Sequence, residues 1–164
     1  MLKILHVEDS ALLAEYVKRR CLGRLEVDRV GDLAAAKEKL KNGVFDILLV
    51  DLKLPDSNGL QTVKSLSTYN LPIIILTANQ DDFDVEELVE AGADDYIIKA
   101  DLKNIDLVGR IKFIFSRNSV INTKAMGIAA ARFNESNNFH KRSSLSFSGI
   151  NAMKPYLSCS LFAG

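Results

Sequence analysis

The chain has 164 residues, of which 48% are hydrophobic and 26% charged, and its 21 basic and 21 acidic side chains leave no net charge. This composition indicates a globular protein of one ordinary domain plus an appendage, and it excludes binding to nucleic acid or membranes through overall charge. Two cysteines are too few for a disulfide framework, and the N-terminus meets acidic residues too early for a signal peptide. No apolar run has transmembrane length, so we expect a cytoplasmic protein.

The charges are unevenly distributed along the chain. Residues 1–118 hold 16 Lys and Arg against 20 Asp and Glu, a net of −4, whereas residues 119–164 hold 5 against 1, a net of +4. Ser and Asn supply 13 of those last 46 residues, and only weak helical or strand patterns occur there, at residues 123–133, 145–148 and 157–161. We predict a folded domain followed by a basic tail that is disordered or loosely packed.

Short apolar runs and helical periodicity alternate along residues 1–118. Strands are predicted at residues 4–7, 25–30, 47–50, 72–76 and 96–98, and helices at residues 10–22, 32–41, 61–67, 81–90 and 105–117. Ser10 and Asp32 are typical N-cap residues for the first two helices. This alternation predicts an α/β fold with a parallel sheet, helices on both faces, right-handed crossovers and the weak second strand at an edge.

Apolar residues recur at helical spacing within these helices, and those of the fourth helix are expected to face inward. The recurring residues are Leu12, Leu13, Tyr16, Val17 and Cys21 in the first helix, Phe83, Val85, Leu88 and Val89 in the fourth, and Ile105, Val108, Ile111 and Phe115 in the last. Residues 112–115 fit core packing, a dimer face or the start of a linker helix. His6, inside the first strand, is expected to be a hydrogen-bonded core histidine.

Polar residues end four of the five predicted strands. They are Glu8 and Asp9, Asp51, Thr77 and Lys99, in chain order. In a doubly wound sheet the carboxyl ends of the strands meet at one edge, so these side chains should lie together. Three carboxylates repel one another unless a cation joins them, and a site made only of oxygen ligands favours Mg²⁺. The sequence therefore predicts a magnesium site.

Asp51 is the candidate reactive group, because it follows four consecutive apolar residues directly. A carboxylate can attack a phosphoryl group and form an acyl phosphate. Such a transfer depends on positioning and on neutralisation of charge more than on a general base. Lys99 and the Mg²⁺ would supply positive charge, and the Thr77 hydroxyl could donate to a phosphoryl oxygen.

Four segments, VEDS, ILLVDLKLPDSNGL, IIILTA and DDYIIKA, occur in the order and spacing of a known family. The chain resembles the receiver domain of two-component response regulators over residues 1–118. The resemblance implies a flavodoxin-like (βα)5 fold with sheet order 2-1-3-4-5. It also implies Mg²⁺ bound by Glu8, Asp9, Asp51 and the backbone carbonyl of Lys53. Asp51 would be the phosphoacceptor, and the donor a phosphohistidine of a sensor kinase or phosphotransfer protein.

The resemblance also implies how the phosphoryl group is read out. Thr77 and Lys99 would contact it, and Tyr96 would turn inward as Thr77 moves toward it. The face formed by the fourth helix, fifth strand and fifth helix would then bind partners, which could include a second copy of the chain. Lys53 and Asn79 stand at the positions that tune the lifetime of the acyl phosphate in the family.

One position departs from the family pattern. Ala100 follows Lys99, where the family usually has a proline joined by a cis peptide bond. A cis bond before a residue other than proline costs about 3–4 kcal/mol. Either this strain is tolerated, or the loop runs trans and Lys99 sits differently.

Other functions fit the sequence less well. A metal-dependent phosphohydrolase usually has a second aspartate two residues after its nucleophile, where Lys53 stands, so we do not expect a conventional enzyme. An interaction module that is never phosphorylated is disfavoured because all five site residues are present. Residues 119–164 are too few for a winged-helix DNA-binding domain, so the chain is either a stand-alone receiver or the N-terminal piece of a longer regulator or hybrid kinase. A further hypothesis is that the basic tail contacts the acidic domain or an anionic partner.

Overall fold

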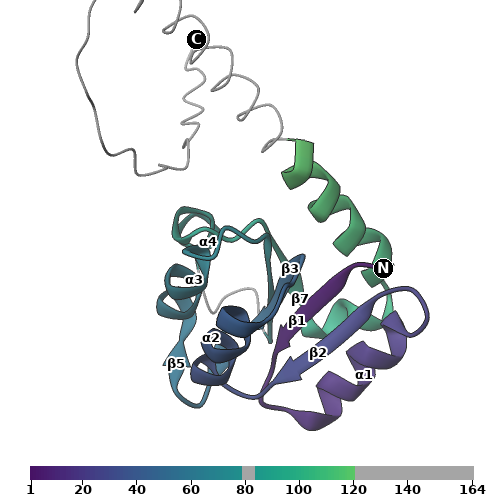
Figure 1. Cartoon of the computed structure of the whole chain (residues 1–164), viewed down its shortest axis with the longest axis horizontal. Helices are drawn as coiled ribbons and strands as arrows, with labels where there is room; N and C mark the ends of the chain where they lie inside the picture. The colour runs from purple at the N-terminus through teal and green to yellow at the C-terminus, as the bar shows by residue number, and fades with distance from the viewer. Residues whose placement is uncertain (79–83, 121–164) are drawn as a thin grey trace, which may run out of the picture. The chain divides into compact units, whose positions relative to one another are not determined.

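A computed structural model describes residues 1–78 and 84–120 (Figure 1). The chain divides into a first unit, Met1–Lys124, and a remainder that lies outside the described residues. The patterns predicted at residues 123–133, 145–148 and 157–161, and the predicted character and contacts of the tail, therefore lie outside the described part of the chain. No helix within the described ranges is long and apolar enough to cross a membrane.

A five-stranded parallel sheet forms the centre of the described domain. Its strands are β1 (Lys3–Val7), β2 (Glu26–Val30), β3 (Ile47–Asp51), β6 (Ile73–Thr77) and β7 (Asp95–Ile98). Their order across the sheet is β2-β1-β3-β6-β7, and every neighbouring pair is parallel. This is the predicted order 2-1-3-4-5, with the weak second strand at an edge.

Helices cover both faces of this sheet. They are α1 (Ala11–Cys21), α2 (Leu33–Asn42), α3 (Gly59–Ser67), α4 (Val85–Ala91) and a last helix that begins at residue 107 and continues to residue 120. Figure 1 shows α1 and the last helix on one side of the sheet and α2, α3 and α4 on the other. The doubly wound architecture predicted from the alternation is therefore confirmed.

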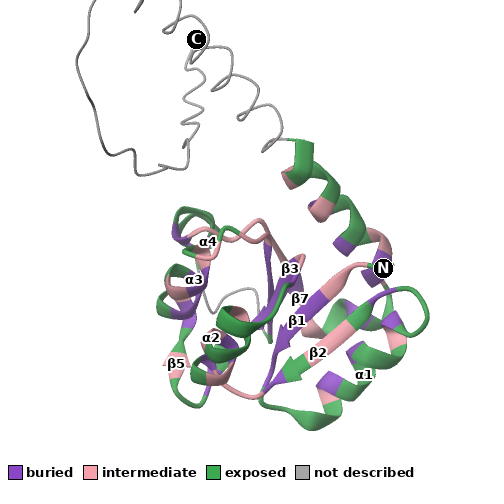
Figure 2. Ribbon diagram, viewed as in Figure 1, coloured by how far each residue is buried: buried purple, intermediate pink, exposed green. Residues whose placement is uncertain are grey.

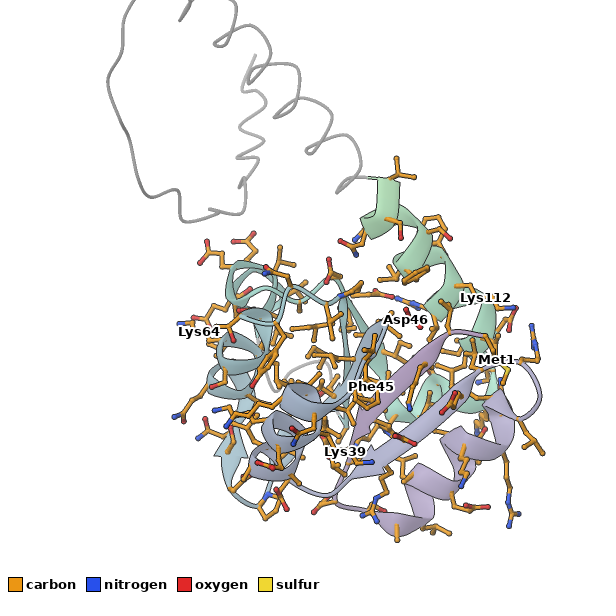
Figure 3. The ribbon with its side chains drawn as sticks, viewed as in Figure 1. Met1, Lys39, Phe45, Asp46, Lys64 and Lys112 are labelled. Carbon is orange, nitrogen blue, oxygen red and sulfur yellow. The ribbon has the colours of Figure 1, made fainter. Side chains whose placement is uncertain are left out.

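Unbroken apolar runs form the inner strands because each strand is covered on both faces. Successive side chains of β3 point to opposite sides: Leu48 and Val50 join the core under α2, α3 and α4, and Ile47 and Leu49 join the core under α1 and the last helix. Figure 2 shows the inner strands as the buried centre of the domain. Lysines on the helices, such as Lys64, instead point outward (Figure 3).

Both predicted N-caps are confirmed. The Ser10 hydroxyl accepts a hydrogen bond from the Leu13 amide at 3.3 Å, and the Asp32 carboxylate accepts one from the Ala35 amide at 2.6 Å. Each bond satisfies a backbone donor that the first helical turn leaves without a partner.

Some apolar residues that repeat at helical spacing lie on the surface, and the inward orientation predicted for Val85 and Val89 is wrong. Leu12 on α1 is 84% exposed and Val89 on α4 is 59% exposed, and Tyr16 and Val85 are also exposed. The reason is that a short helix lying on a sheet buries only a narrow stripe, made here of small residues such as Ala14. Phe83, and the predicted start of the fourth helix at residue 81, lie outside the described residues.

Residues 112–115 belong to the last helix, and some of their side chains lie in the core while others lie on the surface. Ile114 is buried, whereas Phe113 is 64% exposed. The described helix also extends beyond its predicted end at residue 117.

Two elements beside the site were not predicted. A short hairpin joins β4 (Lys53–Leu54) to β5 (Ser57–Asn58) directly after β3, and a 3₁₀ helix, η2 (Lys99–Lys103), follows β7. Elements of two to five residues are too short for hydrophobic periodicity to reveal.

Candidate functional site

The predicted site residues meet at the carboxyl edge of the sheet. Glu8 follows β1, Asp51 and Thr77 are the last residues of β3 and β6, and Lys99 follows β7. Parallel strands place these ends side by side, which is why residues up to 91 positions apart in sequence come together.

Three carboxylates form the acidic part of the site. One oxygen each from Glu8, Asp9 and Asp51 lies within 4.8 Å of the other two. Glu8 is fully buried and Asp51 is 4% exposed, whereas Asp9 is exposed. Hard oxygen ligands with one open side suit Mg²⁺, which keeps several waters, and the absence of nitrogen or sulfur ligands in this cluster disfavours zinc. The donor set therefore fits the predicted magnesium ion.

Lys99 bridges two of these carboxylates. Its Nζ lies 2.7 Å from Asp51 Oδ2 and 3.0 Å from Glu8 Oε2. Glu8 Oε2 has no well-aligned hydrogen-bond donor among the described residues, so its contact with Lys99 is chiefly electrostatic. Buried acids must be paired to be tolerated, and this ammonium provides the pairing.

Burial and charge act in opposite directions on the pKa values of the site. Burial raises the pKa of Glu8, and the nearby Asp51 adds to the rise, while Lys99 opposes it. Burial acts to lower the pKa of Lys99, but its hydrogen bond to Asp51 and its attraction to the Asp51 and Glu8 carboxylates outweigh that effect and raise it. Lys99 is therefore a firmly protonated cation beside the acids.

The Lys99–Ala100 peptide bond is trans, as no cis peptide occurs in the described part of the chain. Of the two alternatives that Ala100 left open, the structure adopts the unstrained one, and Lys99 still reaches Asp51. The loop is held from α1: Arg20 donates to the Ile105 carbonyl at 2.5 Å and to the Lys103 carbonyl at 3.5 Å. Leu102 of η2 is buried in the core below.

The loop after Asp51 is also fixed by hydrogen bonds. The Lys53 amide donates to Asp51 Oδ1 at 3.1 Å, which places Lys53 directly against the site. Farther along, the Asp56 carboxylate accepts bonds from the Leu33 and Ala34 amides of α2, both at 2.9 Å. Sequence analysis identified Lys53 but missed this role of Asp56, because the contact joins residues 22 or 23 positions apart.

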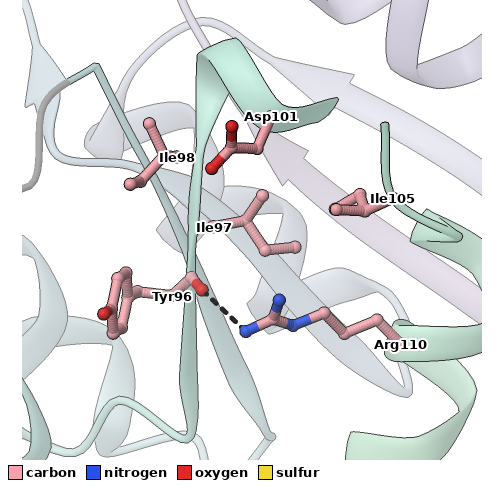
Figure 4. Close-up of a pocket in the computed structure, with 6 residues that line it drawn as sticks. All are labelled: Tyr96, Ile97, Ile98, Asp101, Ile105 and Arg110. Carbon is pink, nitrogen blue, oxygen red and sulfur yellow. Dashed lines mark hydrogen bonds between the residues drawn. The ribbon is translucent and has the colours of Figure 1, made fainter. Parts of the chain in front are cut away.

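Thr77 and Tyr96 occupy adjacent strands. Thr77 is buried and pairs with Ile98 of β7, while Tyr96 is partly buried and packs on the core beneath α2, α3 and α4. Its ring lies on the opposite side of β7 from Arg110, whose guanidinium donates to the Tyr96 carbonyl at 3.1 Å (Figure 4). Asn79, the other predicted lifetime residue, lies outside the described residues.

A small cavity of about 180 Å³ adjoins this strand (Figure 4). It is lined by Tyr96, Ile97, Ile98, Asp101, Ile105 and Arg110. The cavity lies beside β7 and η2, whereas the carboxylates belong to the segment after β1 and to β3.

His6 corrects another prediction. It is fully buried, but neither ring nitrogen has a hydrogen-bond partner among the described residues, so the expected hydrogen-bonded core histidine is wrong in that respect. Burial lowers the pKa of His6 to about 3, and the charges of Lys99 and Arg29 add to the effect. His6 is therefore neutral at pH 7 and is not placed among the carboxylates that could hold a metal.

Arg29, near the end of β2, was missed by the sequence analysis. Its Nε donates to the Glu8 carbonyl at 2.9 Å and its Nη2 donates to the Asp9 carbonyl at 2.6 Å. The only sequence signal is a long basic side chain near the end of an edge strand, which is usually a solvated surface residue.

With this geometry established, comparison with known proteins identifies the family. Residues 4–112 match the family model of the response regulator receiver domain. The chain belongs to this family. The resemblance read from the four sequence segments is thereby confirmed.

Curated relatives extend beyond the receiver. The chain is 33% identical over 132 residues to the virulence transcriptional regulatory protein PhoP of Salmonella typhi, covering 79% of this chain and 58% of that protein. It is 36% identical over 120 residues to the response regulator ArlR of Staphylococcus saprophyticus, covering 71% of this chain and 54% of that protein. The chain thus spans just over half the length of these relatives.

Solved receiver domains have the same fold. The receiver domain of the TMAO respiratory system response regulator TorR is 30% identical with a TM-score of 0.64, covering 71% of this chain and 98% of that one. A CheY-like receiver domain protein from Methanospirillum hungatei is 26% identical with a TM-score of 0.63, covering 73% and 97%.

Proposed function

We propose that this receiver domain is a phosphoacceptor in which Asp51 takes a phosphoryl group from a phosphohistidine. The observation that supports it is the surroundings of Asp51, a nearly buried carboxylate with an ammonium at 2.7 Å and two further carboxylates within 4.8 Å. Burying these charges together lowers the stability of the fold. The binding of a cation and a phosphoryl group would give the cluster a function that explains this cost.

Glu8, Asp9, Asp51 and the backbone carbonyl of Lys53 would hold Mg²⁺ in this proposal. When bound, the ion would neutralise charge on the transferring phosphoryl group. The chain supplies oxygen ligands from two neighbouring strand ends, and Lys99 balances part of their charge until a metal binds.

In the transfer, an oxygen of Asp51 attacks phosphorus and forms an acyl phosphate. The P–N bond of the donor breaks, and its electron pair stays on the imidazole nitrogen of the partner. Lys99 would move from Asp51 to a phosphoryl oxygen, a short displacement for a side chain that is 22% exposed. Thr77 would donate its hydroxyl to another phosphoryl oxygen.

The readout would involve Thr77, Tyr96 and the face formed by α4, β7 and the last helix. Thr77 ends the strand beside Tyr96, so movement of one toward a phosphoryl group would open space for the other. This face exposes Val89 and Phe113, apolar side chains suited to a partner such as a second copy of the chain. Lys53 and Asn79 would set how long the acyl phosphate survives.

Membership of the family indicates which classes of partner and output we propose for this chain. A sensor histidine kinase or a histidine phosphotransfer protein would donate the phosphoryl group, in the cytoplasm. PhoP is named a transcriptional regulatory protein, and this chain would serve either as a stand-alone receiver or as the receiver of a longer regulator.

Intact-mass measurement after incubation with Mg²⁺ and a small acyl phosphate donor tests the proposal. We expect one added phosphoryl group, which chelation of the metal prevents and Asp51→Asn abolishes. Asp46→Asn is the matched control, because Asp46 lies just before the opposite end of β3, where its carboxylate accepts a hydrogen bond from the Lys3 amide at 2.7 Å. A wild-type chain that gains nothing, while a known receiver reacts in parallel, would favour an interaction module that is never phosphorylated.

A further inference from the structure

The two acids at the end of β1 stand just beyond the hydrogen-bond ladder of the sheet. β1 pairs with β2 and β3 as far as Val7, after which the Glu8 amide bonds to the Val30 carbonyl at 2.9 Å. The backbone of Glu8 and Asp9 then leaves the sheet toward α1. Because this short segment directs one carboxylate inward and the other to the surface, its position sets their spacing.

Arg29, on the neighbouring edge strand β2, donates hydrogen bonds to this segment. Its guanidinium is a planar fork, and two of its nitrogens contact consecutive carbonyls, Glu8 at 2.9 Å and Asp9 at 2.6 Å. Bonds from a charged donor to a carbonyl are stronger than neutral ones, and a fork that spans two acceptors also restricts their orientation. The next residue of β2, Val30, accepts a hydrogen bond from the Glu8 amide, so this edge strand binds both the amide and the carbonyl of Glu8.

We infer that Arg29 is a positioning residue for the metal site: its fork holds the Glu8–Asp9 backbone so that both carboxylates face the cation. The inference rests on the proposed magnesium site, and it assigns to Arg29 a geometric role rather than a purely electrostatic one. A geometric role and a charge role predict opposite results, since a cation near the site repels Mg²⁺ whereas a well-placed backbone favours its binding.

Two substitutions separate these roles. Arg29→Lys keeps the charge but loses the fork, and Arg29→Gln loses both. We expect both variants of the full chain to bind Mg²⁺ about tenfold more weakly than wild type, measured by calorimetry, because supporting groups of metal ligands typically contribute at least that much. Arg19→Gln is the control, because the Arg19 side chain is 78% exposed and, in the part of the chain that the structure describes, pairs only with Glu15 on the same helix.

A second measurement needs no metal. In the metal-free protein, the carbonyl ¹³C shifts of Glu8 and Asp9 should move in both Arg29 variants and stay fixed in Arg19→Gln, with the unfolding midpoint near that of wild type. A general loss of structure would be recognised separately, because it would move shifts throughout the domain and not only those of Glu8 and Asp9.

Wild-type affinity for Mg²⁺ in Arg29→Lys, or tighter binding in Arg29→Gln, would overturn the inference and leave only a charge effect. If the wild-type chain binds no Mg²⁺, the proposed metal site fails instead. In that case the metal-free shifts still decide the role of Arg29, because unchanged shifts in both variants would show that it does not hold the segment.

Discussion

The inner strands β1 and β3 bring acids to the site, whereas the edge strands β2 and β7 bring cations, Arg29 near the end of one and Lys99 just after the other. The acids are short side chains fixed at buried strand ends, and the cations are long side chains that reach inward from the periphery. A buried carboxylate is tolerated only with a partner, and only long side chains can supply one without burying a second charge as deeply. The sheet order therefore decides the charge balance of the site.

The contrast between inner and edge strands predicts its largest effect for substitutions that remove packed side chains. Ile75→Ala on inner strand β6 removes a fully buried side chain and should lower the free energy of unfolding by about 3–4 kcal/mol, since the cavity cannot close. Ile98→Ala on edge strand β7, which is partly exposed, should cost about half as much. Urea denaturation at pH 7 measures both, and equal losses would contradict the division into inner and edge strands.

His6 tests the comparison further, because it is a polar side chain of an inner strand with no hydrogen-bond partner within residues 1–78 and 84–120. Its pKa of about 3 lies below its ordinary value near 6.5, so its contribution to stability is present above pH 6.5 and is lost as the pH falls toward 3. Between pH 7 and pH 4.5 the wild type should lose about 2–3 kcal/mol that His6→Leu does not lose.

Denaturation of both proteins at the two pH values measures this difference, because the other titrating groups are common to both. His6→Leu should also be slightly more stable at pH 7, since it removes two unpaired ring nitrogens from the core. Parallel pH dependence in the two proteins would show that His6 is hydrated or paired in solution.

The smallest predicted effect on stability concerns Lys99, the cation that follows edge strand β7. Lys99→Gln should destabilise the metal-free protein by about 1–2 kcal/mol at pH 7, because the ion pairs with Asp51 and Glu8 are lost from a partly exposed position. Lys99 lowers the pKa of Glu8, so its removal raises that pKa further, and the deficit should shrink as the pH falls and Glu8 takes up a proton.

Lys103→Gln is the matched control for this variant, because Lys103 is an exposed lysine of the same 3₁₀ helix. Its stability should equal that of wild type at every pH. A deficit in Lys99→Gln that does not depend on pH would indicate lost packing rather than lost charge pairing.

Sequence patterns predicted the strands well because inner strands of a parallel sheet are buried on both faces, as Ile47 to Val50 are. They predicted helix faces less well, since Leu12 and Val89 repeat with helical spacing yet are exposed. Periodicity reports which side of a helix is apolar, and only the packed sheet decides how much of that side is covered.

By itself the sequence determined the alternation of strands and helices, their caps, and the polar residues that end each inner strand, because these depend on local patterns along the chain. Only the tertiary structure decided which side chains meet across the sheet. The bridge from Lys99 to Glu8 and Asp51, the grip of Arg29 on Glu8 and Asp9, and the anchoring of the trans loop by Arg20 all join distant parts of the chain. A long basic side chain has many possible partners, and the strand order selects among them.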